Sequence, residues 1–230
     1  MKMSNRWWIT VTLVFSLPAL RSAAPDQNRL PGLIQEIRRM KNGFNINTMY
    51  SVALSLPVNH WYDLSGVTKP TAQEGQGIKN GEVFRNSRLS MATVLTTTRP
   101  PTHAEWRVLN NLHLQSNDGD LFVIFAHASP CDANCANPGS PRNIIDLINN
   151  VINRGAWRDK AFVFENIFTP RGQQIADKNK LKQALRDLGT SSIGLANIFR
   201  CFQSKRTRRF RCTSCATGGD VTDDCVNYNA

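Results

Sequence analysis

The chain carries an unbroken apolar run, LFVIFA, at residues 121–126. A strand with no polar position is typical of the centre of a sheet that is covered on both faces. Apolar residues at helical spacing precede this run at residues 103–114 and follow it at residues 144–152. The alternation of helix and strand predicts a layered α/β domain built around this central strand.

The same patterns predict further elements on both sides of the central strand. Strands are expected at residues 50–56, 82–95, 161–164 and 193–199. Helices are expected at residues 32–42 and 181–188. Residues 57–81 form a long connection with no clear element, which is usual for functional or disordered loops.

Two short motifs flank the central strand and contain residue types that bind metals. His103 and Glu105 lie at the start of the helix before the strand, and Cys131 and Cys135 follow the end of the strand. One imidazole and two thiolates leave the fourth position of a tetrahedral zinc site open for water, as catalytic zinc sites require. We therefore expect zinc as the cofactor, bound by His103, Cys131 and Cys135.

Glu105 is the expected catalytic residue of this site. It lies two residues after the ligand histidine, close enough to reach the water without binding the metal. Zinc lowers the pKa of its water toward neutrality, so that hydroxide would attack C4 of cytosine. Glu105 would move protons from the water to the base and to the departing ammonia. These residues predict a zinc-dependent deaminase.

Two other interpretations of these residues remain open. In an oxidising compartment, Cys131 and Cys135 would form a local disulfide, with His103 and Glu105 as ordinary residues on a helix surface. A zinc ion at the same residues would instead be structural, which leaves Glu105 without a catalytic role.

The segment from Ile34 to Phe199 resembles the AID/APOBEC-like cytidine deaminases, in particular their secreted branch. The resemblance rests on HAE at residues 103–105, on SPC at residues 129–131 with Cys135, and on the order of strands and helices. It implies a cytidine deaminase-like three-layer α/β/α sandwich with a five-stranded mixed sheet. It also implies conversion of cytosine to uracil in single-stranded DNA or RNA, with immune mutagenesis of foreign nucleic acid as the biological role.

The chain departs from the family pattern near the expected pocket. Relatives often carry Trp directly before the Ser-Pro-Cys motif, where this chain has Ala128, which predicts a wider pocket. Relatives often carry aromatic residues in the loop after the fourth strand, whereas residues 169–173 (TPRGQ) contain none. Three residues separate Cys131 from Cys135 instead of the commonest two, although positions i and i+4 still share one face of a helix.

The first residues are typical of a secretory signal peptide. Lys2 and Arg6 precede a mostly apolar stretch at residues 7–20, and small residues follow at 22–24, where we expect cleavage. The stretch is shorter than the roughly 20 residues of a membrane span, and an uncleaved anchor is the alternative. We expect residues 1–23 to be the signal peptide and the mature protein to be extracellular, without stable membrane insertion.

Charge and cysteine content divide the mature chain into two expected parts. Residues 24–200 are expected to form the deaminase domain, and residues 201–230 a basic, cysteine-rich C-terminal extension. The full chain has 28 basic and 17 acidic residues, a formal charge of +11, and removal of residues 1–23 leaves 25 − 17 = +8. This surplus favours polyanionic partners.

The extension combines cysteines with a basic run. We expect two disulfides among Cys201, Cys212, Cys215 and Cys225, and the sequence leaves their pairing open. The basic run suits contact with phosphates and a stacked base, although a solvated charge run or a proprotein cleavage site is the alternative. Candidate nucleic-acid contacts are Lys205, Arg206, Arg208, Arg209, Phe210 and Arg211, together with Arg85 and Asn86 in the second expected strand.

Three functions follow from these observations. Deamination of a single-stranded polynucleotide is the leading one. Deamination of free cytidine or deoxycytidine is the second, because the expected pocket lacks the wall tryptophan. The third is a basic extracellular protein that binds polyanions and keeps zinc for stability, without a catalytic role for Glu105.

Overall fold

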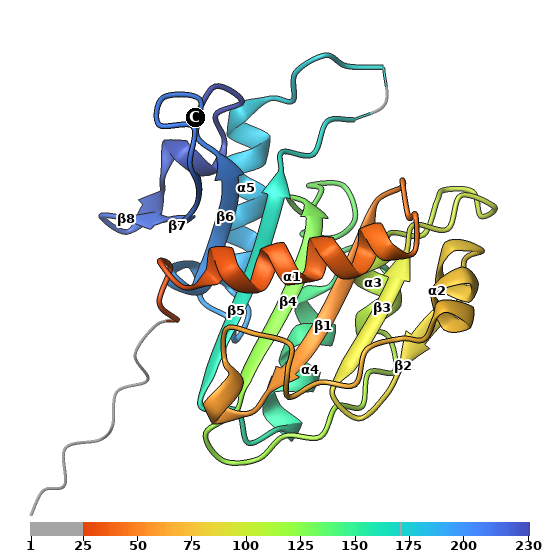
Figure 1. Ribbon diagram of the computed structural model, residues 1–230. Helices are drawn as coiled ribbons and strands as arrows, with labels where there is room; N and C mark the ends of the chain where they lie inside the picture. The colour runs from red at the N-terminus through yellow and green to blue at the C-terminus, as the bar shows by residue number, and fades with distance from the viewer. Residues whose placement is uncertain (1–24, 171) are drawn as a thin grey trace, which may run out of the picture.

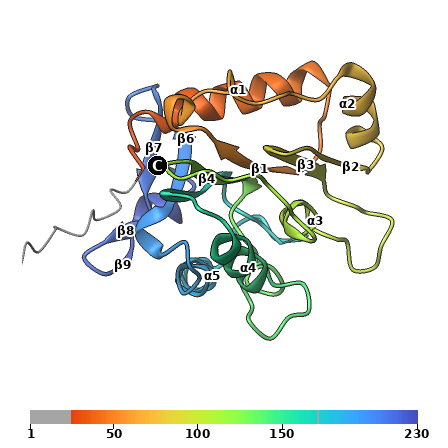
Figure 2. The same ribbon diagram turned by 90° about the horizontal axis from the view of Figure 1, so that it is seen from below.

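The computed structural model describes residues 25–170 and 172–230. A central sheet separates two layers of helices, as Figures 1 and 2 show. One face is covered by α1 (Leu30–Gly43) and α2 (Ala72–Lys79), and the other by α3 (Ala104–Leu109), α4 (Ile145–Arg154) and α5 (Lys178–Gly189). The expected signal peptide lies outside the described residues. Within the described part of the chain, no helix is long and apolar enough to cross a membrane.

The central sheet has seven strands in the order β2-β3-β1-β4-β5-β6-β7. They are β1 (Tyr50–Leu56), β2 (Val83–Arg85), β3 (Leu89–Thr93), β4 (Leu121–Ala128), β5 (Asp159–Asn166), β6 (Ile198–Gln203) and β7 (Phe210–Ser214). β4, β5 and β6 are parallel, and the other neighbours are antiparallel. The carboxyl ends of β4, β5 and β6 therefore lie at the same end of the sheet (Figure 1). A separate ribbon pairs β8 (Ala216–Thr217) with β9 (Asp220–Val221).

The central strand β4 divides its side chains between two hydrophobic cores. Phe122 and Ile124 belong to the core on the side of α3, α4 and α5, whereas Val123 and Phe125 belong to the core under α1. Residues 121–126 are all fully buried, which confirms the prediction of a strand covered on both faces. Each large apolar side chain buried in this way contributes about 1.5–3 kcal/mol to stability.

The expected five-stranded sheet is wrong, because the sheet has seven strands. Residues 82–95 were expected to form one strand but form the hairpin of β2 and β3. Asn86 closes its turn, since Oδ1 accepts hydrogen bonds from the backbone N of Arg88 and of Leu89. The seventh strand, β7, pairs with β6 at the sheet edge, and its basic residues hid the strand pattern in the sequence.

A helix that we did not expect, α2, lies within residues 57–81. A capping box fixes its start: Thr71 Oγ1 accepts from the backbone N of Glu74 at 3.3 Å, and the Glu74 carboxylate accepts from the backbone N of Thr71 at 2.7 Å. Its mostly polar sequence offered no apolar helical stripe, so only this cap marked it.

The last parallel strand begins later than expected. Residues 193–199 were the predicted strand, but Gly194 has a φ of 76° and a short 3-10 helix follows at Leu195–Asn197, so β6 begins at Ile198. The expected domain boundary at residue 200 falls inside β6. The residues on both sides of that boundary therefore share one sheet.

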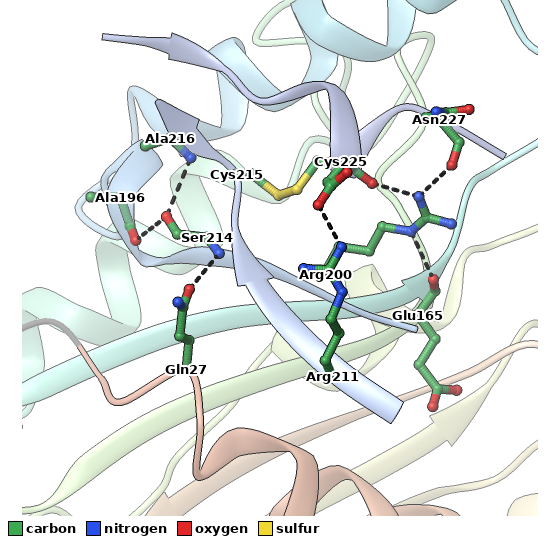
Figure 3. The surroundings of a disulfide bond; sticks show 11 residues. Gln27, Glu165, Ala196, Arg200, Arg211, Ser214, Cys215, Ala216, Cys225 and Asn227 are labelled. Carbon is green, nitrogen blue, oxygen red and sulfur yellow. Dashed lines mark hydrogen bonds and ion pairs between the residues drawn. A yellow bond between two sulfur atoms is a disulfide. The ribbon is translucent and has the colours of Figure 1, made fainter. Parts of the chain in front are cut away.

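Residues 201–230 complete this edge of the sheet and are held by two disulfides. Cys201–Cys212 joins opposite positions of β6 and β7, and Cys215–Cys225 closes the following segment. Figure 3 shows how Arg200 anchors that segment. Its guanidinium donates to the backbone oxygens of Glu165 at 3.3 Å, Asp224 at 2.6 Å and Asn227 at 2.7 Å.

Candidate metal centre

Three side chains of metal-ligating type meet beside the carboxyl end of β4. His103 is the N-cap residue of α3, and Cys131 and Cys135 lie in the turns that follow β4. His103 Nδ1 is 3.1 Å from Cys135 Sγ and 3.6 Å from Cys131 Sγ. The three ligand atoms lie within 4.8 Å of one another. We call these three residues the metal cluster, and they are the residues that the motifs singled out.

The cysteine segment is a series of turns, and not the helix that its i, i+4 spacing suggested. The backbone N of Cys135 donates to Cys131 Sγ at 3.4 Å, and the backbone N of Ala136 donates to the carbonyl oxygen of Cys131 at 3.0 Å. A backbone N–H directed at a sulfur favours its thiolate form. Both cysteines are buried and free, so the structure does not contain the alternative local disulfide.

Two arginines hold the metal cluster in place. Arg107 is buried in α3 and donates to the carbonyl oxygens of Gly81 and, at 2.5 Å, of Thr93, which anchors the helix to β3. Arg142 follows the cysteine turns and donates to the carbonyl oxygens of Pro100 at 2.8 Å and Pro101 at 3.2 Å. This second contact joins the segment before the histidine to the segment after the cysteines.

The three cluster residues change one another's pKa. The pKa of Cys131 is lowered by hydrogen bonding to Cys135 and to His103. The pKa of Cys135 is raised by its interaction with Cys131 and by burial. The pKa of His103 is raised by its interaction with Cys131. The imidazole and the two thiols therefore share protons among three closely spaced ligand atoms. A divalent cation that bound there would displace those protons.

Glu105 is buried beside the cluster, with 4% of its surface exposed. Burial raises the pKa of its carboxyl from 4.5 to about 7, against the lowering effect of His103. A carboxyl whose pKa lies near neutrality can both accept and donate a proton around pH 7. This is the property that a proton shuttle requires.

The donor set fits zinc. One imidazole nitrogen and two sulfurs are ligands that zinc prefers, and three protein ligands leave one tetrahedral position open. Calcium and magnesium prefer oxygen ligands, which the cluster does not offer. The metal cluster can therefore hold a metal ion, and its chemistry matches that of catalytic zinc.

The loop between β5 and α5 borders the metal cluster and carries an aromatic residue that the sequence interpretation missed. The ring of Phe168 lies 6.1 Å from the ring of His103, measured between centroids. The backbone N of Phe168 donates to Ser129 Oγ at 2.9 Å, which ties the loop to the motif before Cys131. Our interpretation considered residues 169–173 only, and the aromatic position directly precedes them.

Tyr228 supports the same loop from the C-terminal segment. Its hydroxyl lies 2.9 Å from Thr169 Oγ1 and accepts a hydrogen bond from the backbone N of Ala176 at 3.1 Å. The hydroxyl also donates to the carbonyl oxygen of Phe168 at 3.4 Å. No local sequence signal marks this contact, because it joins residues about 60 positions apart.

Arg85 and Asn86 have structural partners away from the metal cluster. Arg85 donates to the carbonyl oxygens of Arg107 at 3.0 Å and Asn110 at 2.9 Å, at the end of α3 opposite the cluster. Asn86 donates to a backbone oxygen in the connection at residues 57–81. The structure does not bring these two candidate contacts to the cluster.

The basic run lies in the turn between β6 and β7 and in β7 itself. Residues 205–209 are exposed at the end of the sheet where β4 leads into the metal cluster. Arg211 pairs with Asp224 at 2.8 Å. Phe210 is half-buried, and the guanidinium carbon of Arg38 lies 5.2 Å from its ring centroid. The run is therefore partly solvated and partly packed against α1.

The sequence of this chain matches a known protein family. A family model described as Secreted Novel AID/APOBEC-like Deaminase 1 matches residues 29–229, which include both motifs and both disulfides. Comparisons with curated proteins and with solved structures find no match. Because the family match spans most of the chain, the protein belongs to the family of Secreted Novel AID/APOBEC-like Deaminase 1.

Proposed function

We propose that this protein is a secreted zinc-dependent deaminase that converts cytosine to uracil in single-stranded DNA or RNA. The observation that carries the proposal is the buried carboxyl of Glu105 beside a cluster of one histidine and two free cysteines. Membership of a deaminase family supports the reaction class. The apolar N-terminal stretch and the two disulfides support an extracellular location, where the enzyme would act on foreign nucleic acid.

Glu105 performs the proton transfers of this reaction. When bound, zinc supplies the Lewis acidity that makes a water molecule nucleophilic at neutral pH. The Glu105 carboxylate accepts a proton from the attacking water and passes it to N3 of cytosine. Glu105 then takes the remaining proton from the oxygen added at C4 and passes it to the amino group, so that the C4–N bond breaks, ammonia leaves and a C4=O bond remains. A pKa of about 7 suits both directions of transfer.

Phe168 supplies the aromatic surface near the cluster. An aromatic ring stacks on any base and tolerates differences in sequence. The main-chain contact of Phe168 to Ser129 fixes the start of its loop relative to the motif that contains Cys131. We therefore assign Phe168, and not residues 169–173, as the base-contacting position of this loop.

The test is the isosteric change Glu105→Gln, which keeps the size of the side chain and removes its proton transfer. We expect conversion to fall by about 10²–10⁴-fold, while zinc stays at about one ion per chain. Mature protein is incubated at low salt with single-stranded DNA and RNA, and cytosine-to-uracil conversion is measured by sequencing. Glu82→Gln is the control for loss of a carboxylate elsewhere. Full conversion by Glu105→Gln would rule out this mechanism.

Deamination of free cytidine or deoxycytidine is the second candidate. It is favoured by Ala128, which occupies the position where related deaminases often place a tryptophan wall, and which is buried here. A nucleoside enzyme would release ammonia from cytidine at a rate that an excess of oligonucleotide does not change, even at low salt. A polynucleotide enzyme would be inhibited by the oligonucleotide, and added salt would relieve that inhibition.

A further inference from the structure

A hollow of about 440 Å³ opens on the α1 face of the sheet, opposite the face that carries the metal cluster. It lies at the carboxyl ends of β4, β5 and β6, which contribute His127, Glu165 and Arg200. α1 contributes Arg38 and Lys41. We call this hollow the α1 pocket. Only a few residues of chain separate its His127 from Cys131 of the metal cluster, on the other face.

Positive charge dominates the α1 pocket. Arg38 and Lys41 supply its free cations, and Glu165 is the only acidic residue among its lining. Arg200 also borders the pocket, but its guanidinium is bound to the backbone oxygens of Asp224 and Asn227. Arg38 lies one helical turn from Lys41 on α1, and 49% of its side chain is exposed. The guanidinium of Arg38 lies over Phe210, which directly follows the exposed basic turn between β6 and β7. The positive surface therefore continues from the pocket into that turn.

Two buried polar atoms in this pocket lack hydrogen-bond partners within the described residues. They are Glu165 Oε1 and His127 Nδ1. Glu165 Oε1 lies 3.5 Å from Arg38 Nε, which is an ion pair without a hydrogen bond. Buried polar atoms without protein partners are rare in native structures and leave room for water or a bound group. Because a carboxylate oxygen only accepts hydrogen bonds, the partner of Glu165 Oε1 must be a donor. The ring of Phe210 beside Arg38 holds the planar guanidinium of this arginine where a ligand could reach it.

We propose that the α1 pocket is a second binding site for single-stranded nucleic acid, which holds the phosphodiester backbone of a strand whose target base lies at the metal cluster. This inference deepens the proposed function. The position of the target base at the metal cluster rests on that function, whereas binding of the strand by the α1 pocket does not. Arg38 and Lys41 of α1, against the single carboxylate of Glu165, favour an anionic ligand. Their continuity with the basic turn at residues 205–209 favours an extended polyanion over a small one.

The carboxylate of Glu165 sets how the site responds to pH. Burial raises its pKa from 4.5 to about 6, against the lowering effects of Arg38 and Lys41. The titratable or charged groups that line the pocket with it are Arg38 and Lys41 from α1, Tyr50 from β1, His127 from β4 and Arg200 from β6. Below pH 6 the pocket loses its only negative charge, so anions should bind more tightly there.

The experiment compares two double variants, each of which loses two positive charges from the α1 side of the sheet. Arg38→Ala/Lys41→Ala empties the α1 pocket of two cations, whereas Arg39→Ala/Lys69→Ala removes two cations from a different hollow beside α1. Both are made in the Glu105→Ala background, so that the substrate is not consumed. Binding of labelled single-stranded DNA and RNA of about 30 and about 5 nucleotides is measured by fluorescence anisotropy over a salt series.

We expect Arg38→Ala/Lys41→Ala to weaken binding of the long strand about tenfold and to reduce its salt slope by about 1.4. The control pair should change binding by less than about threefold, and the short strand should respond to neither pair. Lys41→Ala alone leaves the Arg38–Glu165 ion pair intact and should show about half of the effect on the logarithm of the dissociation constant. Glu165→Gln should tighten binding at pH 7 and reduce the dependence of binding on pH near 6, where His127 of the pocket also gains charge as pH falls.

Three results would overturn the inference. Equal losses in the two pairs would show general attraction between charges. Loss of binding for inorganic phosphate and a nucleoside monophosphate, with no dependence on strand length, would assign the pocket to a small anion. Long-strand deamination by an Arg38→Ala/Lys41→Ala protein that keeps Glu105, at an unchanged KM, would place the strand elsewhere. If binding depends on the pocket but no deamination occurs, the proposed function fails and the binding site stands.

Discussion

The two faces of the sheet each carry a histidine and a glutamate of raised pKa near the carboxyl end of β4, in opposite surroundings. Beside the metal cluster, His103 and Glu105 lie next to two thiols, and the pKa of His103 is raised. In the α1 pocket, burial and the cations Lys41 and Arg38 lower the pKa of His127. In the functions proposed above, Glu105 moves protons beside a metal on one face, whereas Glu165 sets how tightly anions bind on the other. Their partners, and not their identities, decide the chemistry.

The largest expected difference between the two faces is in zinc content after loss of one side chain. Cys135→Ala leaves two ligands in the cluster, so we expect zinc content to fall from about one ion per chain to below about one tenth, with deamination reduced more than about a hundredfold. His127→Ala on the opposite face is the matched control and should keep its zinc. Elemental analysis of the two purified variants decides the matter. Equal zinc in both would mean that the metal binds elsewhere.

The second largest expected effect is the dependence of stability on pH that Glu165 of the α1 pocket gives. Glu165 has a folded pKa of about 6 and an ordinary value of 4.5. Between these values the folded state binds more protons than the unfolded state, so stability falls as pH rises through this window, by at most about 2 kcal/mol, and then stays level. Zinc binding has the opposite trend, because its ligands must lose protons.

Glu165→Gln isolates this contribution. Urea unfolding at several pH values between 4 and 8, with zinc in excess, should give a difference between wild type and Glu165→Gln that changes between pH 4.5 and 6.5 and is constant above. Glu36→Gln is a control on the same helix layer, where the carboxylate accepts a hydrogen bond from the backbone N of Leu64 at 3.0 Å. A constant difference across the whole pH range would show that the surroundings of Glu165 in the folded protein do not shift the pKa of its carboxyl.

Features set by contiguous residues could be predicted from the sequence. The apolar run at 121–126 specified the central strand, and short motifs specified His103, Glu105 and the two cysteines that lie beside them. The cysteine turns were mistaken for a helix because the i, i+4 spacing fits both structures. The signal for α2 was present as the Thr71–Glu74 capping box, but its short polar sequence carried no apolar stripe.

Features made by distant residues could not be predicted. β7 becomes a strand only through its pairing with β6, which the Cys201–Cys212 disulfide reinforces. The α1 pocket needs α1 to cross the sheet over β5, so that Arg38 meets Glu165 more than a hundred residues later. Neither contact leaves a period or a motif in the sequence, because each depends on the order of the strands.

Tyr228 gives the smallest expected effect and tests how far the C-terminal segment reaches into the metal face. Tyr228→Phe removes the hydroxyl that contacts Thr169 and Ala176 and frees the loop that carries Phe168. We expect stability to fall by about 1 kcal/mol and zinc to stay bound. We also expect KM for the oligonucleotide to rise severalfold, with a smaller change in kcat and a broader choice of flanking bases in the sequenced products.

The control for this change is Tyr62→Phe, which removes a hydroxyl that accepts from the backbone N of Asp26 at 2.7 Å, on the α1 side. It should cost similar stability without altering KM or the flanking-base preference. Equal kinetic changes in the two variants would mean that the loop responds to overall stability. A change confined to Tyr228→Phe would show that the C-terminal segment positions the loop beside the metal cluster, and so that residues beyond 200 take part in selecting the substrate.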